Sequence, residues 1–180
     1  MSLDRDEVIA AAVTILDDYG LGDLSMRRLA DALGVKAGAL YWHVANKQSL
    51  LAAVADRILA ELPDPDPALD VRAALTVWAH GLRRVLLGHR DSADLAATAL
   101  ASGLCEHDPL TGVVAVLARD DSAERAAWGA RALLHLVLGH VAEEQNIALF
   151  AQLGKLDGAP GNQDAAFAHA VDALVAGLLR

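Results

Sequence analysis

The sequence contains little cysteine, few aromatic residues and no long apolar run, and two of these shortages exclude a class of protein. One cysteine among 180 residues cannot form an intrachain disulfide. No apolar run reaches the roughly 18 residues that a membrane-spanning helix needs, and no basic segment followed by an apolar one marks a secretory signal. We therefore expect a cytoplasmic protein with no membrane partner. Cys105 is expected to be a small buried residue, with a reactive or metal-binding thiol as the alternative.

The composition favours packed helices. Hydrophobic residues make up 54% of the chain and aromatic residues only 4%, so alanine, leucine and valine account for the excess. These residues, with few threonines and isoleucines, are typical of helices rather than sheets. The composition therefore predicts an all-α fold. The length allows either one large core or a small module joined to a larger one.

The distribution of charge matters more than its sum. A net charge of −9 argues against nucleic-acid binding, which depends on cations that contact phosphates. The segment from 25 to 47 departs from this average, because it contains four cations against the single acid Asp31. Those cations are Arg27, Arg28, Lys36 and Lys47. A local cationic surface on an acidic protein is therefore predicted.

The same segment predicts two short helices joined by a glycine. Ser25 is a candidate N-cap for a helix that ends near Leu33, and Gly34 then lets the chain turn. A second helix is expected from about Lys36 to Val44. Two short helices with this connection are typical of a helix-turn-helix, whose second helix enters the major groove of DNA.

Further helices are predicted on both sides of a proline-rich boundary, PDPDP at residues 63–67, where each proline removes a backbone donor. Before it, helices are expected from Asp4 to Tyr19 and, after an Asn46 cap, to about Leu62. After it, they are expected at about 70–88, 92–101, 109–117, 122–150 and 164–179, with a loop at 153–162. We therefore predict two domains, residues 1–62 and residues 68–180.

The segment LYWHVANKQSLL, Leu40–Leu51, resembles the recognition-helix segment of the TetR family of transcriptional repressors. The similarity is to the tetracycline repressor branch. It extends upstream through YGLGDLSMRRLADALGV, and downstream to LLGHRD at residues 86–91 and LGHVAEEQ at residues 138–145. The resemblance implies a ligand-responsive repressor that acts as a homodimer. It also implies an N-terminal three-helix DNA-binding domain of the helix-turn-helix type and a C-terminal helical domain for ligand binding and dimerisation.

The resemblance also implies roles for residues of the DNA-binding segment. Arg27 is expected to reach a base edge, and Tyr41, His43 and Lys47 to contact phosphates. Leu40 and Val44 are expected in the core, whereas Trp42 packs beneath the reading helix or contacts a backbone sugar. The predicted DNA-binding set is Ser25, Arg27, Arg28, Lys36, Ala37, Gly38, Ala39, Tyr41, Trp42, His43 and Lys47. Residues 37–39 depart from tetracycline repressors, so a different operator sequence is expected.

In the C-terminal part, Trp78 and Leu82 are spaced so that they lie on one face of a helix. They form either one wall of a ligand cavity or part of an ordinary core. The predicted cavity set is Trp78, Leu82, Leu86, Ala96, Leu100, Leu104, Leu136, His140 and Glu143. His140 and Glu143 have a spacing that could bind a metal, or Glu143 could lie at a solvated helix end. The metal-ligand histidine of the tetracycline repressors would fall on Ala96. We therefore expect a largely apolar inducer, with no metal and no other cofactor.

The expected partners are a palindromic double-stranded DNA operator, a small-molecule inducer and a second copy of the chain. The helices at 122–150 and 164–179 have little polar surface and are expected to pair with their copies in the dimer. No nucleophile with an adjacent base and no phosphate-binding glycine loop is evident, so the chain is not expected to be an enzyme. The alternatives are a helical adaptor that does not bind DNA and, as a weaker one, a small-molecule enzyme.

Overall fold

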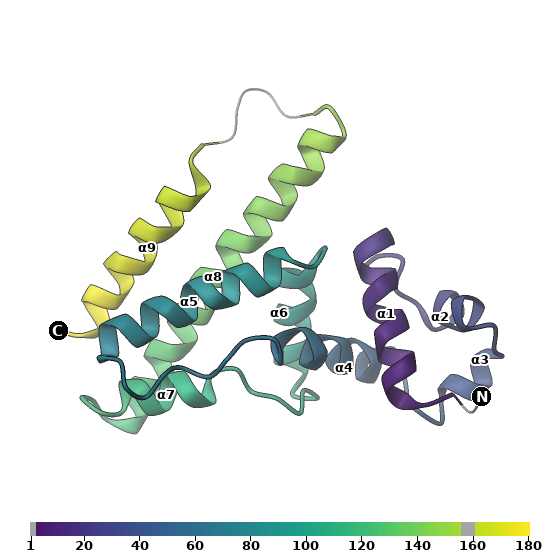
Figure 1. Ribbon diagram of the computed structural model, residues 1–180, viewed down its shortest axis with the longest axis horizontal. Helices are drawn as coiled ribbons and strands as arrows, with labels where there is room; N and C mark the ends of the chain where they lie inside the picture. Colours follow the sequence, from purple (N-terminus) through teal and green to yellow (C-terminus); the bar gives the residue numbers. More distant parts are fainter. Residues whose placement is uncertain (1–2, 156–160) are drawn as a thin grey trace. The chain divides into compact units, whose positions relative to one another are not determined.

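The computed structural model describes residues 3–155 and 161–180, and these residues form helices and no strand. The helices are α1 (Arg5–Tyr19), α2 (Met26–Leu33), α3 (Ala37–Leu40), α4 (Lys47–Leu59), α5 (Val71–Leu87), α6 (Ser92–Ser102), α7 (Thr111–Leu117), α8 (Ala123–Gln152) and α9 (Gln163–Leu178) (Figure 1). The predicted all-α fold is confirmed. None of the described helices is both long enough and apolar enough to cross a bilayer.

The chain divides into two compact units, and each of them is made of two separate segments of the sequence. The N-terminal unit contains Met1–Glu61 and Leu86–His107, and the C-terminal unit contains Leu62–Val85 and Asp108–Arg180. The segment 86–107, which includes α6, therefore packs with the first four helices rather than with the C-terminal helices. The functional division into residues 1–62 and 68–180 stays a prediction.

In the N-terminal unit, side-chain caps define where helices begin. Asp4 accepts a hydrogen bond from the Glu7 amide at 2.8 Å, and Glu7 accepts one from the Asp4 amide at 3.1 Å. Ser25 caps α2 by accepting from the Arg28 amide at 3.2 Å, and Asn46 caps α4 by accepting from the Ser49 amide at 2.9 Å. Such bonds satisfy amides that have no partner inside the helix. The predicted Ser25 and Asn46 caps are confirmed.

The helices of the N-terminal unit enclose one apolar core. α1 packs against α2 and α4, α2 packs against α3, and α4 packs against α6. The largest fully buried side chains of this unit are Leu16, Leu24, Leu29, Leu40, Leu50, Ile58, Leu59, Leu86 and Leu95. Burying one such side chain contributes about 1.5–3 kcal/mol relative to leaving it exposed. This core holds the short α3 against α2.

Two predicted helix bounds were wrong. The reading helix was expected from Lys36 to Val44, but α3 ends at Leu40 and the next three residues form turns. Lys36 precedes α3, and its side chain makes no capping hydrogen bond to the helix. Gly38, the second residue of α3, has a low helix propensity. A helix was also expected to begin at Pro109, whereas α7 begins at Thr111. Asp108 first forms a turn by accepting from the Leu110 amide at 2.9 Å.

In the C-terminal unit, α8 packs against α7 and α9. Gly129 allows close packing, because a Cβ atom there would lie 3.1 Å from Leu178. Trp128 on α8 is 63% exposed in the single chain, and the expected pairing of α8 with a second copy stays a prediction. Part of the predicted loop at 153–162 lies outside the described residues.

Candidate functional site

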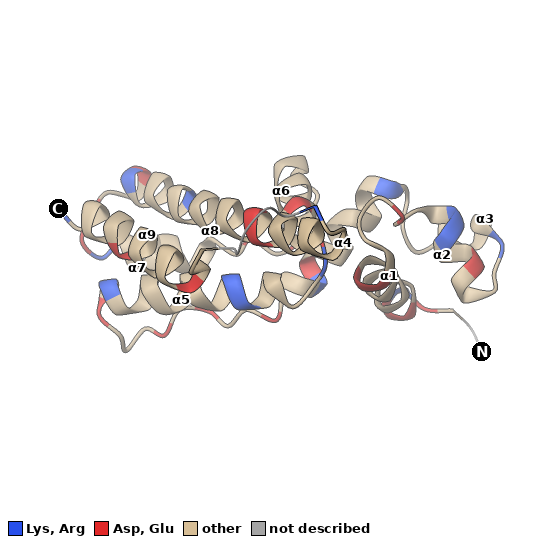
Figure 2. Ribbon diagram, turned by 90° about the horizontal axis from the view of Figure 1, so that it is seen from above, with Lys and Arg blue, Asp and Glu red and all other residues tan. Residues whose placement is uncertain are grey.

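Most of the residues expected to contact DNA are exposed on α2, on α3, in the turn that follows and at the first residue of α4. We call this the reading surface, and its exposed members are Arg27, Lys36, Ala37, Gly38, Tyr41, Trp42 and Lys47. Figure 2 shows Lys and Arg residues in blue on α2 and near α3. The predicted cations and two aromatic side chains are therefore exposed on consecutive segments of the N-terminal unit. Ala39 and His43 are half-buried members of the same segment.

Neighbouring arginines of α2 differ in their surroundings. Arg28 forms an ion pair with Asp23 at 3.1 Å, and its guanidinium lies 4.2 Å from the centre of the Tyr19 ring. Arg27 is exposed and has no ion-pair partner among the described residues. A guanidinium without a protein partner keeps its donors available for a base edge or phosphate. Arg27 is therefore better placed than Arg28 for direct contact with DNA.

The aromatic residues after α3 point away from the core. Trp42 is 90% exposed and Tyr41 is 54% exposed, whereas Leu40 and Val44 are buried. Burial of Leu40 and Val44 confirms their predicted core role. Of the two positions considered for Trp42, packing beneath the reading helix is excluded by its exposure. Both rings are therefore available for contact with a partner of the reading surface.

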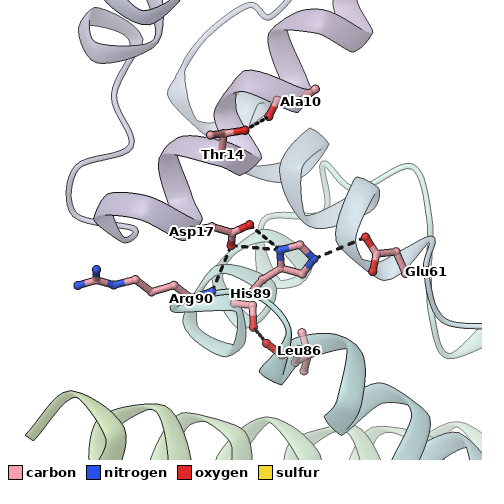
Figure 3. A network of polar contacts seen from close by, with 8 residues as sticks. Ala10, Thr14, Asp17, Glu61, Leu86, His89 and Arg90 are labelled. Carbon is pink, nitrogen blue, oxygen red and sulfur yellow. Dashed lines mark hydrogen bonds and ion pairs between the residues drawn. The ribbon is translucent and has the colours of Figure 1, made fainter. Parts of the chain in front are cut away.

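A cluster of polar contacts attaches the segment after α5 to α1 and α4. We call His89, Arg90 and Asp91 the HRD clasp. The His89 Nδ1 atom lies 3.1 Å from a carboxylate oxygen of Asp17, and its Nε2 atom lies 3.5 Å from Glu61 (Figure 3). The Arg90 amide donates to Asp17 at 3.3 Å. The clasp therefore connects α1 and Glu61, which lies two residues after the end of α4, to the start of α6.

Asp91 holds the clasp to the end of α1 from an unusual backbone conformation. Its φ of 52° lies in the left-handed region, and its carboxylate accepts from the Leu21 amide at 2.8 Å. Gly20 has a φ of 86°, which favours glycine, and a Cβ atom there would also lie 2.6 Å from the same carboxylate. Aspartate tolerates left-handed backbone better than most residues. The sequence flagged the LLGHRD segment but gave no sign of these partners.

A second attachment joins α4 to the segment after α6. The Asp56 carboxylate accepts hydrogen bonds from the amides of Glu106 and His107 at 2.9 and 3.0 Å. Glu106 also pairs with Arg5 at 3.2 Å. Sequence reasoning did not identify Asp56, since a single acidic residue on a helix carries no distinguishing pattern. Together with the clasp, Asp56 connects both ends of the α6 segment to the helices that support the reading surface.

The predicted cavity residues fall in both units. Leu86, Ala96, Leu100 and Leu104 belong to the N-terminal unit, and Trp78, Leu82, Leu136, His140 and Glu143 belong to the C-terminal unit. Trp78, Leu82, Leu86 and Ala96 are buried, Leu100, Leu136 and His140 are half-buried, and Leu104 and Glu143 are exposed. A hollow in the C-terminal unit is lined by other residues, among them Leu117, Arg125, Trp128 and Leu178. The cavity set stays a prediction.

Inside the C-terminal unit, the carboxylate that is held by the protein is Glu144 rather than Glu143. Arg83 donates to both Glu144 oxygens at 2.8 and 2.7 Å, and to Asp164 at 2.7 Å. The bonds to Glu144 and Asp164 raise the pKa of the Arg83 guanidinium, which stays protonated. Arg83 also lies over Phe167, 5.0 Å from the ring centre. These contacts join α5, α8 and α9.

His140 lies beside this ion-pair cluster with an unsatisfied polar atom. Its ring meets the edge of Phe167 at 5.4 Å between centres, and His80 approaches the same ring at 5.1 Å. The buried Nδ1 atom of His140 has no hydrogen-bond partner among the described residues. A buried polar atom without a partner is costly, so native proteins usually supply one. His140 is thus the predicted cavity residue with an open hydrogen-bonding capacity.

The chain matches two family models. The model described as "Bacterial regulatory proteins, tetR family" matches residues 8–54, and "Tetracyclin repressor-like, C-terminal domain" matches residues 62–160. The class G tetracycline repressor of Vibrio anguillarum is 36% identical over 151 residues, which cover 79% of this chain and 70% of that protein. Both the DNA-binding segment and most of the remaining chain thus have relatives among repressors.

Solved structures extend this similarity to the whole fold. BioQ with its natural double-stranded DNA operator has a TM-score of 0.84 and 36% identity, and the match covers 98% of each chain. A variant of TetR from Acinetobacter baumannii AYE in complex with minocycline has a TM-score of 0.81 and 35% identity. That match covers 97% of this chain and 96% of the other. One similar protein is thus seen with DNA and another with a small molecule.

Asp91 gives a test of the HRD clasp. Asp91→Ala should lower the free energy of unfolding by about 1–3 kcal/mol, because it leaves the Leu21 amide without its acceptor and puts alanine in left-handed backbone. Asp91→Asn keeps an acceptor oxygen and tolerates that backbone, so its stability should stay close to that of the parent. Urea unfolding followed by circular dichroism at one protein concentration measures both. Equal losses for the two substitutions would contradict this account of the clasp.

Proposed function

The chain belongs to the TetR family of bacterial regulatory proteins, which are ligand-responsive DNA-binding repressors and not enzymes, and we propose that its reading surface holds the operator. The observation that carries the proposal is the exposed arrangement of Arg27, Trp42 and Lys47 over a core that buries Leu40. The acidity of the rest of the chain would keep other faces away from DNA. Residues 1–62 would then serve DNA binding, in the cytoplasm where bacterial DNA lies.

Within the reading surface, the residues divide by the kind of contact that each can make. Arg27, which has no ion-pair partner among the described residues, would read a guanine through two hydrogen bonds in the major groove. Tyr41, His43 and Lys47 would contact phosphates, and Trp42 would lie against a backbone sugar. Arg28 would act indirectly, because Asp23 and Tyr19 already hold its guanidinium. The phosphate contacts set position, and Arg27 contributes sequence preference.

Residues 68–180 would serve dimerisation and ligand binding. The homodimer seam would use α8 and α9, because Trp128, Gly139 and Gly177 expose apolar or small positions along these helices. A Cβ atom at Gly139 or Gly177 would meet no atom of the described residues within 4 Å. Close approach of a second copy explains why glycine stands at these two helical positions.

The inducer would be a largely apolar organic molecule that binds without a metal. The cavity residues expected from the sequence are mostly apolar, and Ala96 stands where tetracycline repressors have a metal ligand. The His140 Nδ1 atom would supply a hydrogen bond that orients the molecule, since it has no partner in the described chain. Glu143 is exposed, so its place in the cavity depends on what covers α8 in the dimer.

Selection from a library of random DNA duplexes tests the proposed operator binding, because selection requires no assumption about the operator sequence. The recovered duplexes should share two half-sites related by a two-fold axis, with centres about 34–36 Å apart. That spacing follows from two reading surfaces in one dimer, each entering the major groove on the same side of the helix. Recovery of no preferred sequence, or binding to a single half-site as tight as to the pair, would contradict the proposal.

Substitution of Arg27 and substitution of Lys47 should weaken binding of the recovered duplex in different ways. Arg27→Ala should cost about 1–3 kcal/mol of binding free energy and relax preference at one base pair in each half-site. Lys47→Ala should weaken binding to all sequences similarly and lower the slope of log affinity against log salt by about one. Fluorescence anisotropy over a range of salt concentrations measures both. The assignment of roles is wrong if the two losses are equal and independent of salt.

Charged substitutions test the dimer seam. Gly139→Arg and Leu174→Asp place charge where a second apolar helix would lie, so each should shift the protein toward monomers. Ala115→Arg, at an exposed position on α7, adds the same charge as Gly139→Arg and should leave the dimer intact. Light scattering with size-exclusion chromatography measures the mass. Dimer mass retained by both α8 and α9 variants would place the seam elsewhere.

The inducer proposal is tested with whatever small molecule mass spectrometry identifies in the purified protein. That molecule should release the selected duplex equally well with and without EDTA. His140→Leu should weaken its binding at least tenfold, roughly the loss of one good hydrogen bond. The free protein should not be destabilised, because the substitution removes an unsatisfied buried atom. His135→Leu, at an exposed position of the same helix, is the matched control. Release that requires magnesium would overturn the metal-free reading of the site.

A further inference from the structure

A second hollow of the C-terminal unit lies where α5 and α8 begin and where α7 and α9 end. It encloses about 620 Å³, within the range of small-molecule sites. We call it the arginine hollow, because its lining includes Arg72, Arg119, Arg125 and Arg180. None of its lining residues belongs to the predicted inducer cavity. Four guanidinium groups gather here on a chain whose net charge is −9.

Two of the three carboxylates in the arginine hollow already have partners. Asp121 accepts hydrogen bonds from Arg125 at 2.8 Å and from the Ser122 amide at 2.7 Å. These bonds hold the pKa of the Asp121 carboxyl below its usual range. Asp70 accepts from the Ala73 amide at 2.8 Å, in the first turn of α5. Both carboxylates are therefore committed to the protein, and so is the Arg125 guanidinium.

Arg72 and Arg119 keep donors that the protein does not use. Arg119 donates to the Leu69 carbonyl at 3.1 Å, which holds its guanidinium beside the hollow and leaves its other donors open. Both arginines are exposed, and neither has an ion-pair partner among the described residues. Two helices begin at the hollow and two end there, so their dipoles oppose one another. The guanidinium groups therefore set its preference for an anion.

The same hollow also has an apolar part. Leu117 is buried, whereas Val71, Leu178 and Leu179 are half-buried and keep apolar surface in contact with water. Covering that surface favours a ligand with an apolar body. A guanidinium matches a carboxylate through two parallel hydrogen bonds. The ligand that uses both parts is therefore an organic acid with a hydrocarbon portion.

We propose that the arginine hollow binds an organic carboxylate with an apolar chain. The carboxylate pairs with Arg72 and Arg119, and the chain covers Leu117 and Leu178. This site is separate from the inducer cavity, and it does not depend on the proposed operator binding. A neutral molecule would leave the two guanidinium groups unused, and a cation would be repelled by them.

Nuclear magnetic resonance of the arginine side chains tests the proposal at the site itself. Octanoate is titrated into the ¹⁵N-labelled protein, and each Nε–H signal is assigned from the spectrum of the glutamine variant that lacks it. The signals of Arg72 and Arg119 should move along one saturable curve. The signal of Arg131, an exposed arginine of α8 outside the hollow, should stay in place. Saturable movement of other signals without these two would place octanoate elsewhere and overturn the proposal.

Two further probes separate the charge of the ligand from its chain. Octylammonium, which has the same chain and the opposite charge, should bind at least tenfold more weakly than octanoate. Hexanoate is two methylene groups shorter and should bind about five- to fifteen-fold more weakly, as expected if those groups are buried. Equal binding of octanoate and octylammonium would overturn the role of the arginines. Equal binding of octanoate and hexanoate would overturn the role of the apolar part.

Substitution of Arg72 completes the test. Arg72→Gln should lower octanoate affinity at least fivefold, and Arg131→Gln, the matched control, should stay within twofold of the parent. Calorimetric titration measures both. The melting temperature of Arg72→Gln should equal that of the parent, because this arginine has no ion pair to lose among the described residues. Equal affinities of the two variants for octanoate would overturn the proposal, as would the absence of saturable binding to the parent.

Discussion

The reading surface depends on the burial of two side chains beneath a helix of only four residues. A helix this short is not stable alone, because its few hydrogen bonds do not offset the cost of ordering it. Leu40 and Val44 fix α3 and the turn after it to the core of the N-terminal unit. With the inward positions occupied in this way, the outward positions contribute nothing to packing. A partner, rather than packing within the protein, can therefore determine which residues stand at the positions of Gly38 and Trp42.

The supports of this core also connect it to the segment that carries α6. His89 and Asp91 contact residues in and just after α1, and Asp56 holds the chain beyond the end of α6. A change in α6 would therefore act on α1 and α4 together. These contacts are partly exposed ion pairs and hydrogen bonds, each of modest net strength, so their geometry matters more than their summed energy.

The C-terminal unit shows how a neighbouring position changes the role of a residue. Glu144 is held on both oxygens by Arg83, whereas Glu143 is exposed on the same helix. Removing one partner of a largely buried pair is costly, because the other charge remains desolvated. Arg83 and Glu144 are therefore part of the scaffold that joins α5, α8 and α9. His140 differs from them, because its buried nitrogen is left for something outside the described chain.

The sequence by itself determined the helical fold, the approximate helix bounds, the Ser25 and Asn46 caps and the family, because apolar periodicity, cap residues and the LYWHV segment are local patterns. It did not predict that Arg28 pairs with Asp23 or that Glu144, the neighbour of Glu143, pairs with Arg83. In each case an adjacent residue has the same side chain, and only the tertiary structure decides which of the two meets Asp23 or Arg83. The partners Asp17, Asp56 and Glu61 were missed for the same reason, since contacts between residues far apart in sequence depend on how helices pack.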